Sequence, residues 1–358
     1  MQQIKTILTL IMALAFFQST TAANASSDSS VKEFDPMELI MHHIGDTHDW
    51  HILSYTNNAG EKKNVSIPLP IILIDDRIHV FMSSAFHHGQ ELVQKGGTYY
   101  KLYHEKIYKT DASGTIRYGN DGQVLNAKPL DLSITRNVAS MWLSVLIIIW
   151  LFTAAAKRYK GKPAVPKGIQ SLVEPLILFV RDDVANEQIG KDKAERFMPF
   201  LLTLFFFIWI NNLIGLVPFF PGGSNLTGNI SVTMVLAVIT FFVTNISGTK
   251  SYWGHIFWMP GVPIPIRLLL SVIEIIGLFT KPFALMIRLL ANITAGHIII
   301  LSLLSLIFVM KSVAIAPVSI LMGLMMFMLE LLVAVLQAYI FTLLSALFIG
   351  MAVQSEEH

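Results

Sequence analysis

Charged side chains are scarce in the second half of this chain. Between Met198 and Gln354 the sequence contains only seven formally charged residues and no aspartate. They are Lys250, Arg267, Glu274, Lys281, Arg288, Lys311 and Glu330. About a quarter of the residues in a soluble domain are charged. This segment is therefore expected to fold inside a lipid bilayer.

The composition of the whole chain agrees with this expectation. Of 358 residues, 53% are hydrophobic and 14% are charged. We predict an all-α polytopic membrane protein with about five transmembrane helices and a small β-rich extracytoplasmic N-terminal domain. A net charge of +2 gives no reason to expect a nucleic-acid partner. The absence of cysteine excludes disulfides and thiolate metal sites.

The first 25 residues have the pattern of a cleavable secretory signal peptide. Lys5 precedes an apolar run from Ile7 to Phe17, and small residues end the segment at Ala25. The apolar run is too short to span a bilayer, so an uncleaved anchor is the less favoured alternative. In both cases residues 26–136 are expected outside the cytoplasm.

Residues 26–136 are polar and rich in turns, which predicts a β-rich domain with a short helix near Pro36 to His43. The turn signals are Asn57 to Gly60, Asp111 to Gly114 and Asn120 to Gly122. Eight of the chain's eleven histidines lie in this region, among them His42, His43, His48 and His51. Their spacing fits no standard metal motif, so we predict no metal site and no cofactor. A metal-binding domain is the alternative.

Residues 137–358 are predicted to form the membrane domain. The expected spans are about 138–156, 198–217, 229–246, 266–310 and 318–353, with an amphipathic helix at about 168–190 on the cytoplasmic surface. The first span is followed by Lys157, Arg158, Lys160, Lys162 and Lys167 with no acidic residue among them. Positive residues favour the cytoplasmic side, which places the C-terminus in the cytoplasm.

The last two spans are longer than one bilayer crossing. Residues 266–310 as a single helix would be about 67 Å long, roughly twice the hydrocarbon thickness. Each segment is therefore either a steeply tilted helix or a helix broken near its centre, as Pro282 would permit in the first. Hydropathy does not distinguish these two possibilities.

Five polar side chains inside these two segments fall into a regular register. In an antiparallel hairpin, residues at equal depth have position numbers with a constant sum. Pairing Arg288 with Gln337, and His297 with Glu330, places the turn near residue 313 in both cases. Lys311 and Ser312 interrupt the apolar sequence at this point. Asn292 lies between the two pairs.

Arg288 is the strongest candidate functional residue, because arginine keeps its charge and charge inside a membrane is unfavourable. Asn292 follows it at i+4 on the same helical face. Glu274 lies fourteen residues earlier, within about 40° of that face. We expect His297 and Glu330 to carry protons toward one side of the membrane and Glu274 toward the other. Asn292 and Gln337 taken singly also fit the role of interhelical hydrogen-bonding residues.

At these residues the chain resembles subunit a of the F-type ATP synthase, the stator of the membrane proton channel, in its Bacteroidota-like version with an N-terminal extension. The resemblance runs from about Glu174 to Gly350. It includes Phe179-Val-Arg-Asp182, Gln188-Ile-Gly190, Asn211-Asn-Leu-Ile-Gly215-Leu-Val-Pro218, Arg288-Leu-Leu-Ala-Asn292-Ile-Thr-Ala-Gly296-His297 and Glu330-Leu-Leu-Val-Ala-Val-Leu-Gln337.

The resemblance implies a five-span subunit whose last two helices form a long tilted hairpin against a rotating ring of subunit c. It further implies that Arg288 is the essential arginine, Asn292 and Gln337 its polar neighbours, and Glu274 a half-channel carboxylate. His297 and Glu330 look like the family's acid and histidine pair, here with histidine first. The implied partners are the c-ring, the peripheral-stalk subunit b, the other synthase subunits and the lipid bilayer.

The resemblance implies a protein that is not itself an enzyme, and the chain has no G-x-x-x-x-G-K-[ST] nucleotide loop. Two other classes stay open at this stage. One is a stand-alone ion-coupled secondary transporter, and the other is a membrane sensor with a metal-binding outer domain. The sequence also leaves open whether the coupling ion is H⁺ or Na⁺, the size of the ring and the role of the N-terminal domain.

Overall fold

The computed structural model describes Pro36, Ile40 and residues 45–56, 62–159, 168–217, 220–259 and 261–354. The expected signal peptide at 1–25 and most of the expected helix near Pro36 to His43 lie outside these residues, although Pro36 and Ile40 are both helical.

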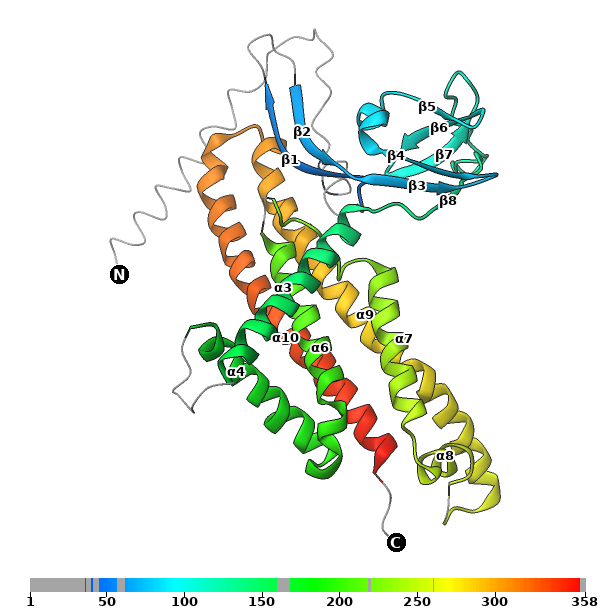
Figure 1. Cartoon of the computed structure of the whole chain (residues 1–358), viewed down its shortest axis with the longest axis vertical. Coiled ribbons are helices and arrows are strands. Elements are labelled where there is room, and N and C mark those ends of the chain that lie inside the picture. The colour runs from blue at the N-terminus through cyan, green and yellow to red at the C-terminus, as the bar shows by residue number, and fades with distance from the viewer. Residues whose placement is uncertain are drawn as a thin grey trace, which may run out of the picture. The chain divides into compact units, whose positions relative to one another are not determined.

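Residues 49–131 form three small antiparallel sheets (Figure 1). The first pairs β1 (Asp49–Thr56) with β2 (Lys62–Pro68). The second has the order β4 (Ile78–Met82), β3 (Pro70–Ile74) and β8 (Leu130–Asp131). The third contains β5 (Val93–Lys95), β6 (Thr98–Tyr103) and β7 (Lys106–Thr110). The β-rich region predicted from the turn signals is therefore present.

Buried and half-buried side chains alternate along β3, and the buried ones form the core of this region. Ile71 and Leu73 are fully buried, and they contact Phe86 of the 3₁₀ helix η2 (Ser83–Gly89) and Tyr100 of β6. Successive side chains of a strand point to opposite faces, so the other residues of β3 face away from this core.

The remaining chain is helical (Figure 1). Its helices are α3 (Arg136–Tyr159), α4 (Ile169–Phe179), α5 (Glu187–Ile189), α6 (Lys191–Leu216), α7 (Ile230–Ile246), α8 (Lys250–Phe257), α9 (Ile264–Val309) and α10 (Ala316–Val353). Four helical segments within the described residues are long and apolar enough to cross a membrane. A fifth crossing results if α7 and α8, which are bent by 105° to each other, count as one broken span. The chain is thus a polytopic helical membrane protein.

The two C-terminal helices are continuous. α9 runs unbroken for 46 residues through Pro282, and α10 for 38 residues. They are joined by a short turn that contains Lys311 at a positive φ of 47° and the 3₁₀ turn η4 (Val313–Ile315). The turn lies where the register of the polar residues placed it. Of the two possibilities left open by hydropathy, the structure has unbroken helices.

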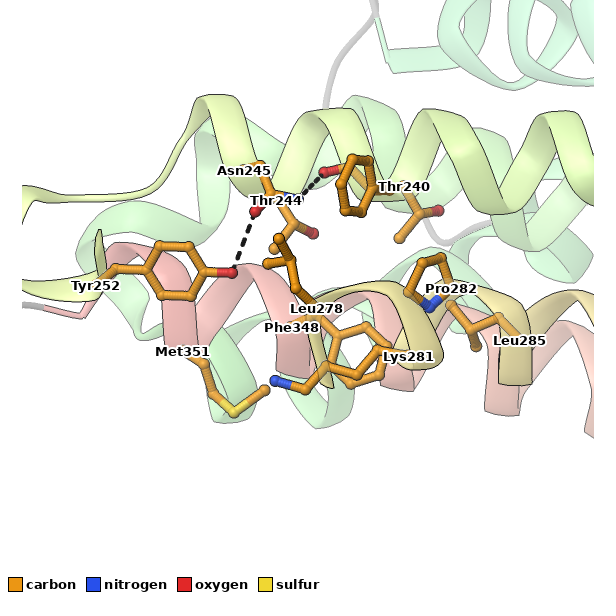
Figure 2. Close-up of a pocket in the computed structure, with 11 residues that line it drawn as sticks. Thr240, Thr244, Asn245, Tyr252, Leu278, Lys281, Pro282, Leu285, Phe348 and Met351 are labelled. Atoms are coloured by element: carbon orange, nitrogen blue, oxygen red, sulfur yellow. Dashed lines mark hydrogen bonds between the residues drawn. The ribbon is translucent and has the colours of Figure 1, made fainter. Parts of the chain in front are cut away.

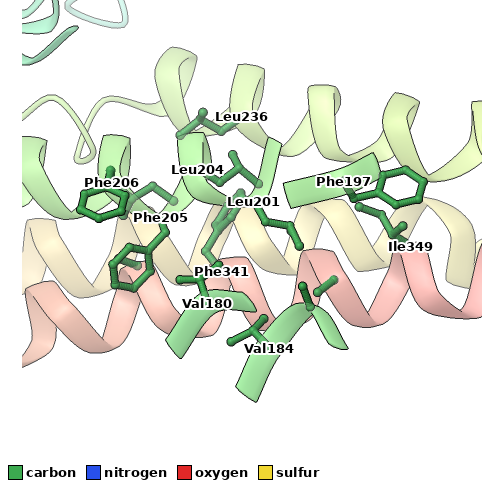
Figure 3. Packing of buried hydrophobic residues seen from close by; sticks show 14 of the residues in the cluster. Val180, Val184, Phe197, Leu201, Leu204, Phe205, Phe206, Leu236, Phe341 and Ile349 are labelled. Atoms are coloured by element: carbon green, nitrogen blue, oxygen red, sulfur yellow. The ribbon is translucent and has the colours of Figure 1, made fainter. Parts of the chain in front are cut away.

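The segment between α3 and α6 covers the helical core. A π-helical stretch, η3 (Val180–Asn186), continues α4 and leads into α5, over the region expected to be one amphipathic helix. Val180 and Val184 are fully buried against Leu201 of α6 and Phe341 of α10 (Figure 3). Arg181 and Asp182 are exposed and pair with each other at 2.8 Å.

Candidate functional site

His297 of α9 and Glu330 of α10 face each other inside the helical hairpin. His297 Nε2 lies 3.8 Å from Glu330 Oε1, and the Glu330 side chain is only 3% exposed. This separation is too long for a direct hydrogen bond. Neither carboxylate oxygen of Glu330 has a hydrogen-bond partner among the described residues. A buried carboxylate in this state needs a proton or water, so the pair is suited to proton exchange.

Helix α6 and the loop that follows it bring polar groups to this pair. Gly215 of α6 packs closely on the backbone of Ser224, and a Cβ added at Gly215 would lie 3.8 Å from His297 Nε2. The Ser224 hydroxyl donates a 2.7 Å hydrogen bond to Asn137 Oδ1 at the start of α3. Ser224 and Asn137 are both buried. These contacts connect the start of α3, through Ser224, to the part of α6 that lies beside His297.

Asn212 forms a second polar contact near Glu330. Its Oδ1 accepts a 2.5 Å hydrogen bond from the Thr227 hydroxyl, and its Nδ2 donates to the Ala334 carbonyl of α10 at 3.4 Å. Ala334 lies one helical turn after Glu330. Asn212 therefore connects α6 to α10 one helical turn from Glu330.

Several buried polar atoms of α6, α9, α10 and the loop after α6 have no hydrogen-bond partner among the described residues. Besides the two Glu330 oxygens, they include Asn211 Oδ1, Asn225 Nδ2 and Thr294 Oγ1. Buried polar atoms are nearly always hydrogen-bonded to protein or water.

Arg288 and Asn292 lie on a different face of α9. Both are exposed, whereas Leu285 and Leu289 on the adjoining face of the helix are buried. Within the described part of the chain, Arg288 has no hydrogen-bond or ion-pair partner. Gln337 of α10, in contrast, is 4% exposed. The equal depth of Arg288 and Gln337 stays a prediction, and the two side chains lie in different environments.

Small side chains surround Arg288 on its exposed face. Ala284, Ala291, Asn292 and Ala295 are all exposed at helical spacing on either side of it. Small residues allow a neighbouring helix to approach closely in a membrane. This face is open to another helix, and its centre is a fixed positive charge.

Glu274 lies near the other end of α9, beside a cavity of about 290 Å³. The lining includes Tyr252 and His255 of α8, Glu274 and Lys281 of α9, and Gln354. A smaller cavity of about 20 Å³ continues from Tyr252 and Lys281 to Leu285. That volume has room for about one water molecule. The two cavities together lead from α8 to within one helical turn of Arg288.

Figure 2 shows the smaller cavity with Lys281 directed between Phe348 and Met351 of α10. The Lys281 ammonium lies 5.7 Å from the centre of the Phe348 ring. On the opposite side, Tyr252 donates a 3.3 Å hydrogen bond to Asn245 Oδ1. The cavity is therefore polar at its α8 end and apolar toward Leu285.

The N-terminal histidines do not assemble a metal site in the described part of the chain, where no group of three potential ligands occurs. His42 and His43 lie outside it. His48 is buried and contacts Asp131 Oδ2 at 2.8 Å. Burial opposes the ionisation of Asp131, but hydrogen bonds from His48 and Ser133 outweigh this effect and lower its pKa. This pair joins the residues before β1 to β8.

Sequence reasoning missed several polar residues of the site. Ser224 and Thr227 lie between the expected spans 198–217 and 229–246, and their uncharged, glycine-rich surroundings gave no signal for burial. His255 was also missed, since α8 is too short and too mixed in composition to stand out. The available signal was that His255 is a titratable residue next to spans that contain very few charged residues.

Two family models match the chain. One, described as ATP synthase A chain, matches residues 138–350. The other, described as a domain of unknown function (DUF8433), matches residues 39–132. The first match contains Arg288, His297 and Glu330, and the second contains strands β1 to β8.

Similar proteins include ATP synthase subunit a of Chloroherpeton thalassium, which is 52% identical over 233 residues, or 64% of this chain and 69% of the relative. ATP synthase subunit a of Chlorobium phaeobacteroides (strain BS1) is 47% identical over 236 residues, covering 64% of this chain and 68% of the relative. That of Myxococcus xanthus is 44% identical over 240 residues, covering 64% and 76%. With these identities and a family match over most of the helical region, the chain belongs to the ATP synthase subunit a family.

Proposed function

We propose that this chain is the proton-translocating stator subunit a of an F-type ATP synthase in a bacterial inner membrane, with Arg288 facing a carboxylate of the rotating c-ring. It is a non-catalytic membrane subunit, and ATP is made by other subunits of the complex. Its partners are the c-ring, the peripheral-stalk subunit b and the remaining synthase subunits. The observation that carries the proposal is the exposed guanidinium of Arg288 among small side chains, with no partner among the described residues.

The role of Arg288 follows from its permanent charge. A guanidinium close to a carboxylate favours the ionised form of that carboxylate. A ring site that arrives at Arg288 therefore loses its proton, and it regains one only after it has moved away. Because arginine cannot relay a proton, it also separates the two access routes. Proton flow is then possible only with rotation of the ring.

We assign one access route to His297 and Glu330. The buried carboxylate, the facing imidazole and the polar contacts through Gly215, Ser224 and Asn137 support this assignment. His297 lies nine residues after Arg288 on α9, a distance of about 13 Å along the axis. Asn292 lies between them on α9, and Gln337 is a buried residue of α10. These residues would deliver protons to the ring from the side of the N-terminal domain.

We assign the second route to Glu274 and the two cavities beside it. Glu274 lies about 21 Å along the axis from Arg288, on the opposite side from His297. The larger cavity contains Glu274, His255 and Lys281, and the smaller one extends it toward Leu285. Protons would leave the ring by this route. His255 is a second titratable group here.

The membrane topology is part of the proposal. The basic residues after α3 favour a cytoplasmic position for that end of the helix. Residues 1–25 would then be a signal peptide, residues 26–136 a periplasmic domain, and the C-terminus cytoplasmic. α9 and α10 would lie steeply tilted, because 46 residues of helix measure about 69 Å and the hydrocarbon core about 30 Å.

The decisive experiment replaces Arg288 with alanine in the assembled synthase. ATP-driven proton pumping into inverted membrane vesicles is expected to fall to background, while the amount of assembled complex is unchanged. Lys311→Ala is the matched control, since it removes a cation of the same helical hairpin at an exposed turn. Normal pumping by an assembled Arg288→Ala synthase would refute the role of this residue.

A further inference from the structure

One face of the sheet β4-β3-β8 is apolar and exposed. In an antiparallel pair, residues directly opposite each other point to the same face. The register pairs Pro70 with Met82, Ile72 with Val80 and Ile74 with Ile78, and it pairs Ile74 with Leu130 of β8. Leu132 continues the alternation of β8. We call these eight side chains the apolar sheet face: Pro70, Ile72, Ile74, Ile78, Val80, Met82, Leu130 and Leu132.

The apolar sheet face has no charged member. Its residues on β4 and β8 and Leu132 are exposed, and its three residues on the central strand β3 are half-buried. Ile78 is 67% exposed, Val80 64%, Leu130 61% and Leu132 56%. The opposite face of the same sheet is the one that packs on the core, through Ile71 and Leu73. Contiguous apolar surfaces of this kind mark sites of contact with a membrane or another protein.

The position of the sheet along the chain indicates which of these covers it. Leu132 N donates to the Ile72 carbonyl at 2.9 Å, and Ile134 N donates to the Pro70 carbonyl at 3.0 Å. The chain thus stays paired with β3 until two residues before α3 begins at Arg136. Four residues span at most about 14 Å, so the sheet lies close to the start of a membrane-crossing helix.

The connection between the sheet and α3 is fixed by hydrogen bonds. Asp46 accepts one from the Thr135 hydroxyl at 2.9 Å and one from the Asn137 backbone N–H at 3.1 Å. The buried Arg136 donates to the Gly45 carbonyl at 2.7 Å. The segment between the sheet and α3 is therefore held in place by hydrogen bonds and is not a free linker.

The start of α3 also exposes large apolar side chains. Trp142 and Leu146, about two and three turns into the helix, are each 61% exposed. Tryptophan is enriched at the boundary between headgroups and hydrocarbon. An exposed tryptophan at this depth marks the level of the boundary, and the apolar sheet face begins within a few residues of it.

We propose that the apolar sheet face lies on the lipid bilayer around α3, with its side chains inserted into the region between headgroups and acyl chains. The charged tip of the β3–β4 hairpin, Asp76 and Arg77, is exposed and would remain among the headgroups. Water in the headgroup region satisfies the free backbone groups of the edge strand β4, which the hydrocarbon core would not. Such a contact resembles that of an interfacial amphipathic element.

The inference gives a role to the domain of unknown function matched at residues 39–132. The domain would be a membrane-resting support for the first span, and its contact would fix the angle at which α3 enters the bilayer. The inference depends on α3 crossing the membrane. It does not depend on the proton routes, so it can fail or hold independently of them.

The test uses the absence of cysteine from this chain. Val80→Cys is labelled with an environment-sensitive fluorophore in the intact synthase, whose other subunits are made cysteine-free. The complex is reconstituted into vesicles of phosphatidylethanolamine and phosphatidylglycerol, with or without a nitroxide on the lipid headgroup. Gln123→Cys, in an exposed turn of the same domain, is the aqueous control, and Ile149→Cys, exposed on α3, is the lipid control.

We expect the label at Val80 to emit to the blue of the label at Gln123 and to lose intensity with nitroxide lipid, as the label at Ile149 does. Leu130→Cys on β8 should give the same result and serves if the first variant assembles poorly. An emission maximum equal to that at Gln123 would overturn the proposal. A blue-shifted label that nitroxide lipid does not quench would also overturn it, because another subunit would then cover the face.

Discussion

Gly296 allows a specific test of the carboxylate at Glu330. It precedes His297 on α9 and packs against α10. A Cβ added at Gly296 would lie 2.6 Å from Glu330 Oε1 and 2.8 Å from its Cδ atom. The best separation of such atoms is about 3.5 Å, so Gly296→Ala forces the carboxyl group to move by about 1 Å.

This displacement should reduce proton flow. The Glu330 side chain is 3% exposed and has little free space, so the added methyl group costs about 1–3 kcal/mol of overpacking. A misplacement of about 1 Å can slow a positioned reaction by about 100-fold. His297 and Glu330 are 3.8 Å apart and form no direct hydrogen bond, so their separation is less critical than that of two groups in direct contact. We therefore expect proton flux to fall by about tenfold, which corresponds to about 1.4 kcal/mol.

A second substitution should restore part of the loss. Glu330→Asp shortens the side chain by one methylene and withdraws its carboxyl group from position 296. We expect the variant with both changes to conduct more protons than Gly296→Ala alone, although Glu330→Asp alone conducts less than the native protein. Flux is measured as passive proton conduction through vesicles stripped of the catalytic sector, normalised to the amount of this subunit.

Gly277→Ala is the matched control, because a Cβ at that position of α9 meets nothing within 4 Å. It should conduct normally. Native flux through assembled Gly296→Ala would show that the position of the carboxylate does not limit conduction. Failure of Glu330→Asp to improve the Gly296→Ala variant would show that the loss has another cause.

Two further predictions concern stability. Gly350→Ala would place a Cβ against the backbone carbonyl of Gln188, and this overpacking should destabilise the fold by about 1–3 kcal/mol and lower the unfolding temperature in detergent. Gly277→Ala should leave the unfolding temperature unchanged. An unchanged unfolding temperature for Gly350→Ala would contradict the close packing of α10 on α5. Asp131 has a lowered pKa in the folded domain, so its ionised contact with His48 stabilises the fold above the ordinary aspartate pKa and loses this effect as the pH falls below it. The hydrogen-exchange protection factors of residues 62–131 in the full chain, which are corrected for the slower intrinsic exchange at low pH, should fall on acidification through that range and fall less in Asp131→Asn. Equal acid dependence of the two proteins would refute this contribution.

The helices were largely predictable because their signals are local. Long apolar runs with few charges gave α3, α6, α9 and α10, whose observed bounds differ from the expected spans by a few residues except at the start of α6. The turn near residue 313 followed from one assumption about His297 and Glu330, and the 3.8 Å contact between them agrees with it. A constant register along two straight helices is a strong constraint.

The remaining features depend on contacts that no local pattern encodes. Pro282 permits a break in a helix, but packing along α10 keeps α9 continuous, and only the assembled structure shows this. Thr227 reaches Asn212 across a loop, fifteen positions along the chain. The sequence of β3 is apolar throughout, so it did not show which of its side chains are buried and which are only half-buried. An exposed apolar residue and a buried one are the same letters in the sequence.

The arrangement of polar groups on the last two helices explains why this protein needs a partner to function. Glu330 and Gln337 are enclosed between helices, where the chain itself controls their environment. Arg288 points out of the same hairpin, and a guanidinium that faces hydrocarbon without a counter-charge is strongly unfavourable. The protein could have removed this cost by placing Arg288 beside Glu330, but a cation paired internally could not act on an approaching carboxylate. Under the proposed function, the outward-facing charge is stabilised when the neighbouring ring supplies a carboxylate, and each carboxylate that leaves would be replaced by the next.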